Sequence, residues 1–393
     1  MTTRVNNTPK PHPYLPTPLP NTLGKHNAIP AKIRCLDKKY ASGVDAAEVA
    51  SYTAQTRNEV TEERYVTMVN GRIETPHAWS VKEMERDELE LMEKRKFLQQ
   101  RGFCLLQYDG SVSNNAIAKI MNPAKARDDG LTDRPGEIPG AKTKFFRELE
   151  RTVKKLTGAK YCKMTAWSIR NGAKRVKGSE ESKGVSFVGA YSFFSHSDFT
   201  PAMGRAAYKM CMKRVPELTE SKAKRMKYSF MNIWKPTNDT VQQFPLGILD
   251  WRTVDPQDCH EVELGYALTP TSKKEKGTSE GEAGYHNKDD GYGARNKADK
   301  SIAGFYMPRL AQVVHRPNHK WVYFPNQTLN EIWLFTQYDQ RFDENNKERF
   351  CKHTFHSAFW DESAPENPIR RQSIEIRLLC AYEDDGDSNK SKL

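Results

Sequence analysis

Short segments of alternating or continuous apolar residues, bounded by turn residues, recur along most of the chain. Such runs predict β-strands, and the clearest examples are 102–108, 159–170, 228–236, 244–254, 321–324, 331–338, 351–360 and 372–382. Asn70-Gly71, between the strand-like segments 64–69 and 72–74, is typical of a hairpin turn. The chain is therefore expected to be rich in antiparallel sheet.

Helical periodicity is confined mainly to the first half of the chain. We expect one helix from Ser80, with a capping box at Glu83, to about residue 100, and a second over 142–156 that Gly158 ends. A third, basic helix is expected over 205–228. Many strands with a few early helices predict a mainly β protein, a β-sandwich or jelly roll with N-terminal helices packed outside it.

The domain organisation follows from shifts in composition. Residues 1–45 contain seven prolines and little periodicity, which indicates an N-terminal arm. Residues 46–382 are expected to form a single domain, interrupted near 272–300 by a flexible insertion that is low in apolar residues. Residues 383–393 form a polar tail that ends in Ser391-Lys392-Leu393, the S-K-L peroxisomal address. A peroxisomal location through the import receptor is therefore expected, with the cytoplasm as the alternative.

Charge and cysteine content narrow the function classes. The formal net charge is +12, but the basic residues are spread along the chain among nearly as many acids, so we expect a solvated surface and no nucleic-acid partner. Seven widely spaced cysteines without a C-x-x-C pair argue against a disulfide framework or a zinc knuckle. No apolar run approaches the roughly 18 residues of a membrane span, so no membrane partner is expected.

Candidate chemistry begins with His196-Ser197-Asp198, in an aromatic segment that reads as a strand. Residues two apart in a strand share a face, so the imidazole of His196 and the carboxylate of Asp198 can reach one divalent ion. Together they form two thirds of the 2-His-1-carboxylate set of non-heme iron oxygenases. The plainer alternative is a strand-end histidine hydrogen-bonded to a nearby aspartate.

The third ligand must come from a distant segment, and His353 and His356 are the best candidates. We favour His356, because the neighbouring Phe355 and Phe359 indicate a buried approach. The competing interpretation is a histidine that is satisfied in the core.

Residues 370–379 add a candidate anion site. Arg371, Ser373, Glu375 and Arg377 fall on one face of the predicted strand, and apolar residues fall on the other. Arg371 and Ser373 can bind a carboxylate through a guanidinium fork and a hydroxyl, which suits a dicarboxylic keto acid whose other end chelates a metal. The alternative is a strand whose polar face meets water.

As a set, eight segments resemble fungal Fe(II)/2-oxoglutarate-dependent hydroxylase/desaturases of the gibberellin desaturase-like and cephem-methoxylase-like group. They occur in the order seen in that family, and are 157–159, 196–198, 232–236, 245–250, 321–325, 337–339, 356–359 and 371–377. The resemblance covers about residues 142–380.

This resemblance implies a double-stranded β-helix fold, with Fe(II) held by His196, Asp198 and His356. It also implies that 2-oxoglutarate is anchored by Arg371, with Ser373 or Arg377 assisting. O2 and a small molecule of secondary metabolism would be the further substrates, and the reaction would be hydroxylation, desaturation or oxidative cyclisation. The carboxylate of Asp198 argues against chlorination, because halogenases leave that position to a halide.

Trp234 and Tyr338 are candidates to line the substrate cavity, although core packing explains either residue as well. The main rival function is a non-oxidative, cupin-like metal enzyme with the same three ligands, which would not need the Arg371 and Ser373 anchor.

Overall fold

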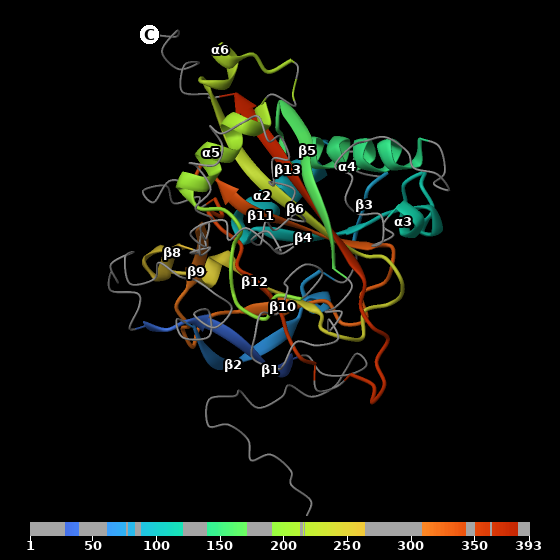
Figure 1. Cartoon of the computed structure of the whole chain (residues 1–393), viewed down its shortest axis with the longest axis vertical. Coiled ribbons are helices and arrows are strands. Elements are labelled where there is room, and N and C mark those ends of the chain that lie inside the picture. Colours follow the sequence, from blue (N-terminus) through green and yellow to red (C-terminus); the bar gives the residue numbers. More distant parts are fainter. Residues whose placement is uncertain are drawn as a thin grey trace, which may run out of the picture.

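Strands dominate the computed structural model of the chain (Figure 1). The structure describes residues 28–38, 61–75, 78–82, 88–120, 140–170, 191–212, 215, 217–263, 309–342, 350–361 and 364–383. Within them the strands form two larger sheets and one two-stranded sheet. No helix in this part of the chain is long and apolar enough to cross a membrane.

The larger sheet has six strands and carries most of the polar residues discussed below. Their order across the sheet is β3 (Trp79–Ser80), β4 (Phe103–Gln107), β11 (Glu331–Asp339), β6 (Met226–Pro236), β13 (Ser373–Glu383) and β5 (Tyr161–Arg170). All neighbours are antiparallel except β3 and β4. The long strands β6 and β13 therefore lie side by side in the middle of the molecule (Figure 1).

The second sheet has five strands, in the order β1 (Ala28–Leu36), β2 (Thr61–Asn70), β10 (Trp321–Tyr323), β7 (Leu246–Leu249) and β12 (His356–Ala358). Strands β8 (Cys259–Glu263) and β9 (Arg309–Val313) form a separate antiparallel pair. Short 3-10 helices follow β2 and β7, at η2 (Gly71–Ile73), η6 (Trp251–Thr253) and η7 (Pro256–Asp258).

An apolar interior joins the two larger sheets. Side chains of β4, β6 and β11 meet those of β7 and β10 in one buried cluster, which includes Phe103, Leu105, Trp234, Leu246, Ile248, Val322, Trp333 and Phe335. Two mainly antiparallel sheets packed face to face around such a core form the predicted jelly roll.

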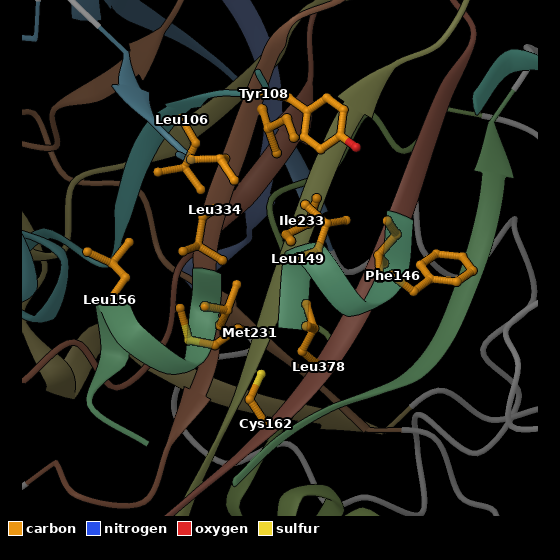
Figure 2. Packing of buried hydrophobic residues seen from close by; sticks show 14 of the residues in the cluster. Leu106, Tyr108, Phe146, Leu149, Leu156, Cys162, Met231, Ile233, Leu334 and Leu378 are labelled. Carbon is orange, nitrogen blue, oxygen red and sulfur yellow. The ribbon is translucent and has the colours of Figure 1, made fainter. Parts of the chain in front are cut away.

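Three helices, α2 (Glu88–Arg101), α3 (Asn114–Ile120) and α4 (Ala141–Thr157), belong to the outer layer. Figure 2 shows α4 placing Leu149 and Leu156 on the side of Met231 of β6 and Leu334 of β11, on the face of the six-stranded sheet away from the interior. Phe146 packs with Trp167 of β5. Phe146, Leu149, Val153 and Leu156 lie three or four residues apart, as one face of a helix requires. Helix α4 ends at Gly158, whose φ of 71° is readily adopted only by glycine. The prediction of helices outside a β core is confirmed.

Three local predictions are wrong. Asn70-Gly71 does not close a hairpin, because the Asn70 side chain caps η2 and β2 pairs with the distant β1 and β10. Ser80 does not cap a helix, since it lies in β3 and donates to Asp109 at 2.5 Å. The helix expected over 205–228 is divided into α5 (Pro201–Cys211) and α6 (Glu220–Ala223), and β6 begins at Met226.

The predicted N-terminal arm includes a strand that the proline content obscured. Residues 28–36 form β1 and pair along their whole length with β2. The rest of the arm, the insertion near 272–300 and the tail 384–393 with its S-K-L tripeptide lie outside the described residues.

Candidate metal centre

The segment that carries His196 and Asp198, residues 191–200, is extended but is not a regular strand. It is attached by single bridges to three different strands. Ser195 N donates to Arg34 O of β1 at 2.7 Å, and His196 exchanges backbone hydrogen bonds with His356 of β12 at 3.2 and 2.9 Å. Ser197 exchanges two more with Ala311 of β9, at 2.8 and 3.0 Å. The predicted strand is therefore replaced by a segment that three strands hold in place.

These bridges bring the three predicted ligands together. Candidate ligand atoms of His196, Asp198 and His356 all lie within 4.8 Å of one another. His196 Nε2 lies 3.6 Å from Asp198 Oδ1, and the two imidazole rings have centroids 4.4 Å apart. Two imidazoles and one carboxylate at these distances can bind one divalent ion, and the donor set is that of non-heme iron enzymes.

The two histidines are oriented by their own backbone. His196 Nδ1 lies 2.9 Å from Phe194 O, and His356 Nδ1 lies 3.3 Å from Thr354 O. A carbonyl accepts only, so Nδ1 carries the proton in each ring, and Nε2 keeps its lone pair for a metal. Burial lowers the pKa of both rings, that of His196 to about 3. Both are consequently neutral near pH 7, which is the form that coordinates a metal.

Asp198 uses one carboxylate oxygen for protein contacts and presents the other to the histidines. Its Oδ2 accepts from Arg377 Nη2 at 2.9 Å and from Gln337 Nε2 at 3.0 Å. Gln337 Oε1 in turn accepts from the backbone N–H of Asp198 at 2.9 Å. Burial by itself would raise the pKa of Asp198, but the charge and hydrogen bond of Arg377 together with the neighbouring ligand residues outweigh burial, and the pKa lies below its ordinary value. The carboxylate is thus ionised and fixed in orientation.

Gln337 is a residue whose part in the site we did not predict. In the sequence it stood out only as part of the motif 337–339. The pattern of residues along β11 does not indicate that this glutamine has a polar partner. Its contact with Asp198 depends on β11 passing beside the segment 191–200, which is a tertiary event.

A second polar group lies at the start of β13. Arg371 is only 4% exposed; its Nη1 donates to Phe244 O, and its guanidinium lies 4.2 Å from the ring centroid of Tyr191 and 5.2 Å from that of Trp234. Among the described residues, Arg371 Nε and the fully buried Ser373 Oγ have no hydrogen-bond partner. Burial lowers the pKa of Arg371 to about 10, so it remains charged near pH 7.

These unpaired donors fit an absent carboxylate. A buried guanidinium with an unpaired N–H and a buried hydroxyl without a partner are unfavourable by themselves, and a carboxylate accepts hydrogen bonds from both. The alternation predicted for β13 also holds, since Ile374, Ile376 and Leu378 pack in the cluster with α4 on the opposite face.

The remaining predicted site residues occupy different places. Arg377 contacts Asp198, whereas its predicted assistance to the keto-acid anchor stays a prediction. Trp234 is 1% exposed and contacts the guanidinium of Arg371. Tyr338 packs with Tyr228 in a buried cluster that includes residues of α5, and its ring also lies beside that of His353. Contact of Trp234 or Tyr338 with the substrate stays a prediction.

Comparison with known proteins identifies the family. A family model described as an oxidoreductase/YMDC permease-like domain matches residues 50–283 and 297–381. The chain belongs to this family. The interruption in the match, at 284–296, falls within the insertion predicted near 272–300.

Fungal relatives of this oxidoreductase-domain protein carry the names that the sequence motifs led us to expect. It is 23% identical over 248 residues to the hydroxylase/desaturase efuI of Hormonema carpetanum, which covers 62% of this chain and 71% of the relative. It is 26% identical over 241 residues to the alpha-ketoglutarate-dependent dioxygenase tstK of Talaromyces stipitatus, covering 61% and 70%. The predicted resemblance to fungal hydroxylase/desaturases and 2-oxoglutarate-dependent dioxygenases is confirmed.

A solved structure confirms the fold of this oxidoreductase-domain protein. The iron and alpha-ketoglutarate-dependent endoperoxidase NvfI superposes with a TM-score of 0.57 at 18% identity, over 92% of this chain and all of the other. A likeness at this level of identity concerns the fold alone.

Proposed function

We propose that the protein is an Fe(II)- and 2-oxoglutarate-dependent oxygenase that acts on a small molecule of fungal secondary metabolism. The observation that carries the proposal is the convergence of His196, Asp198 and His356, with their ligand atoms within 4.8 Å, in a barrel that also buries Arg371 and Ser373 with unpaired donors. The names of its fungal relatives support the same activity.

Each group has a defined task in this proposal. His196, Asp198 and His356 would hold Fe(II), and Arg371 and Ser373 would bind the distal carboxylate of 2-oxoglutarate. Fe(II) held there would supply, together with O2 and 2-oxoglutarate, the oxidising chemistry needed to remove hydrogen from the substrate, and the keto acid would leave as succinate and CO2. The chain itself keeps both imidazoles neutral, fixes the carboxylate of Asp198 through Arg377 and Gln337, and excludes water by burying these groups.

An anaerobic titration tests the proposal. Fe(II) and 2-oxoglutarate added together to the wild-type protein should give the visible metal-to-ligand charge-transfer band of a chelated keto acid. His196→Ala should abolish the band. Absence of the band in a folded, Fe(II)-loaded wild type would refute the activity.

The cupin-like alternative uses the same three metal ligands without a keto acid. Under this alternative the turnover of the wild type does not depend on 2-oxoglutarate, and Arg371→Met should not change that. The oxygenase proposal predicts that the same variant requires much more 2-oxoglutarate, and the unpaired donors of Arg371 and Ser373 favour the oxygenase.

Location is a separate proposal that depends on the sequence alone. Where Ser391-Lys392-Leu393 close the polypeptide, we propose that they direct the protein to peroxisomes through the import receptor. A fluorescent fusion at the N-terminus should co-localise with a peroxisomal marker and should spread through the cytoplasm when these three residues are deleted.

A further inference from the structure

Asn232 lies in the middle of β6, on the face of the six-stranded sheet that points into the barrel. Its neighbour Ile233 packs in the outer cluster with α4, as Figure 2 shows. Successive residues of a strand alternate between faces, so Asn232 and Trp234 point inward, and Trp234 belongs to the inner cluster.

Both cross-strand neighbours of Asn232 contact the metal centre. Arg377 of β13 is its direct partner on one side and donates to Asp198 Oδ2 at 2.9 Å. Phe335 of β11 is its partner on the other side, and its ring centroid lies 4.9 Å from that of His356. Opposite residues in an antiparallel pair have Cβ atoms about 4.5 to 5.5 Å apart. The side chain of Asn232 therefore lies between the residues that support two of the metal ligands.

The amide of Asn232 has nothing to bind among the described residues. The residue is 1% exposed, and neither Nδ2 nor Oδ1 has a hydrogen-bond partner there. A buried amide with both atoms unpaired is unfavourable, and such groups in folded proteins nearly always have a partner. A ligand that enters the site can supply it.

We propose that Asn232 is a further binding residue of the centre, whose Nδ2 donates to the metal-chelating end of 2-oxoglutarate. This rests on the proposed function. The distal carboxylate is assigned to Ser373, which is opposite Pro236, four residues along β6 from Asn232 and thus about 14 Å away along the strand. Asn232 instead lies opposite Arg377, which contacts Asp198, and is therefore on the metal side of the site. The metal-chelating end of the keto acid, a carboxylate and a ketone, carries only acceptors. Asn232 therefore contacts the end that Arg371 does not.

The position of the contact can be tested with two keto acids. 2-Oxobutyrate has the same chelating end as 2-oxoglutarate but lacks the distal carboxylate. Asn232→Ala should weaken the binding of both acids by a similar factor of about 10- to 100-fold, the value of one hydrogen bond to a charged group. Arg371→Met should weaken only 2-oxoglutarate. Binding is followed anaerobically through the charge-transfer band, and the affinity for Fe(II) alone should stay within about 2-fold of wild type, because Asn232 is not a ligand.

Ser229→Ala is the matched control, since Ser229 is a fully buried polar residue of the same strand that bonds Tyr382 instead. It should leave both keto-acid affinities unchanged. Asn232→Ser, which keeps a shorter donor, should give an intermediate affinity and serves as the test if Asn232→Ala does not fold.

The outcomes separate the two proposals. A wild type without the charge-transfer band would overturn the proposed function itself. A wild type with the band, together with Asn232 variants that fold and bind both keto acids with wild-type affinity, would overturn only the role of Asn232. Weakened binding of 2-oxoglutarate with unchanged binding of 2-oxobutyrate would also overturn it, because the contact would then be at the distal end.

Discussion

Gln337→Leu removes the amide that orients Asp198 while nearly preserving side-chain volume. In the structure Gln337 Nε2 donates to Asp198 Oδ2 at 3.0 Å, and Oε1 accepts from Asp198 N at 2.9 Å. Asp198 Oδ2 would keep only the hydrogen bond from Arg377, and the buried N–H of Asp198 would lose its acceptor. Ser197 Oγ would stay paired, because it also donates to the backbone O of residue 337 at 2.6 Å.

The magnitude follows from these contacts. One hydrogen bond to a charged carboxylate is worth about 1.5 to 3 kcal/mol, which corresponds to about 10- to 150-fold in affinity. Loss of a group that supports a metal ligand typically costs about 10- to 100-fold in metal affinity. We therefore expect Fe(II) to bind Gln337→Leu about 10- to 100-fold more weakly. The metal-free protein should also lose about 1 to 3 kcal/mol of unfolding free energy through the unpaired N–H of Asp198.

Anaerobic competition with a chromogenic chelator measures the Fe(II) affinity, and urea unfolding measures stability. Gln327→Leu is the matched control, because Gln327 is equally buried and loses one hydrogen bond, to Glu331 O at 2.9 Å, far from the ligands in sequence. It should lower stability without changing Fe(II) affinity. The reasoning fails if both variants lose similar stability and Gln337→Leu still binds Fe(II) as tightly as wild type.

Three further predictions concern the anchor, a buried histidine and a buried ion pair. Arg371→Met should raise the 2-oxoglutarate Kd at least about 30-fold, as truncation of a buried charge pair costs about 2 kcal/mol or more. Ser373→Ala should raise it about 10- to 100-fold, the value of one hydrogen bond to a charged group, and a wild-type Kd for either variant in an anaerobic titration would contradict this assignment. Burial lowers the pKa of His353 from 6.5 to about 3. As the pH drops below about 6.5, the unfolded state binds a proton at this residue and the folded state does not. The free energy of unfolding therefore falls by up to about 1.4 kcal/mol per pH unit. In urea unfolding at pH 7 and 5, the unfolding free energy of His353→Gln should fall less per pH unit than that of the wild type, by that amount. An equal pH dependence in both proteins would exclude His353 as its cause. Asp250→Ala should cost about 3 to 5 kcal/mol, because the buried Arg101, whose Nε lies 3.1 Å from Asp250 Oδ2, loses a partner; a loss under about 1 kcal/mol in urea unfolding would be inconsistent with this.

The sequence by itself determined the features that depend on local periodicity. The alternation along β13 placed Arg371, Ser373 and Arg377 on one face, and the structure keeps that face inward with the apolar residues against α4. The spacing of apolar residues also defined α4 to within one residue at each end. Periodicity succeeds here because burial on one face of an element leaves its mark on every second, third or fourth residue.

Tertiary structure decided which of these faces meet. His356 joins His196 through a single pair of backbone bridges between segments 160 residues apart, and Gln337 and Asn232 reach the centre only because β11, β6 and β13 are neighbours. The Asn70-Gly71 turn shows the converse, since a good local hairpin signal lost to the pairing of β2 with β1 and β10. Strand pairing is fixed by which surfaces the whole chain can bury together, and no short window of sequence contains that information.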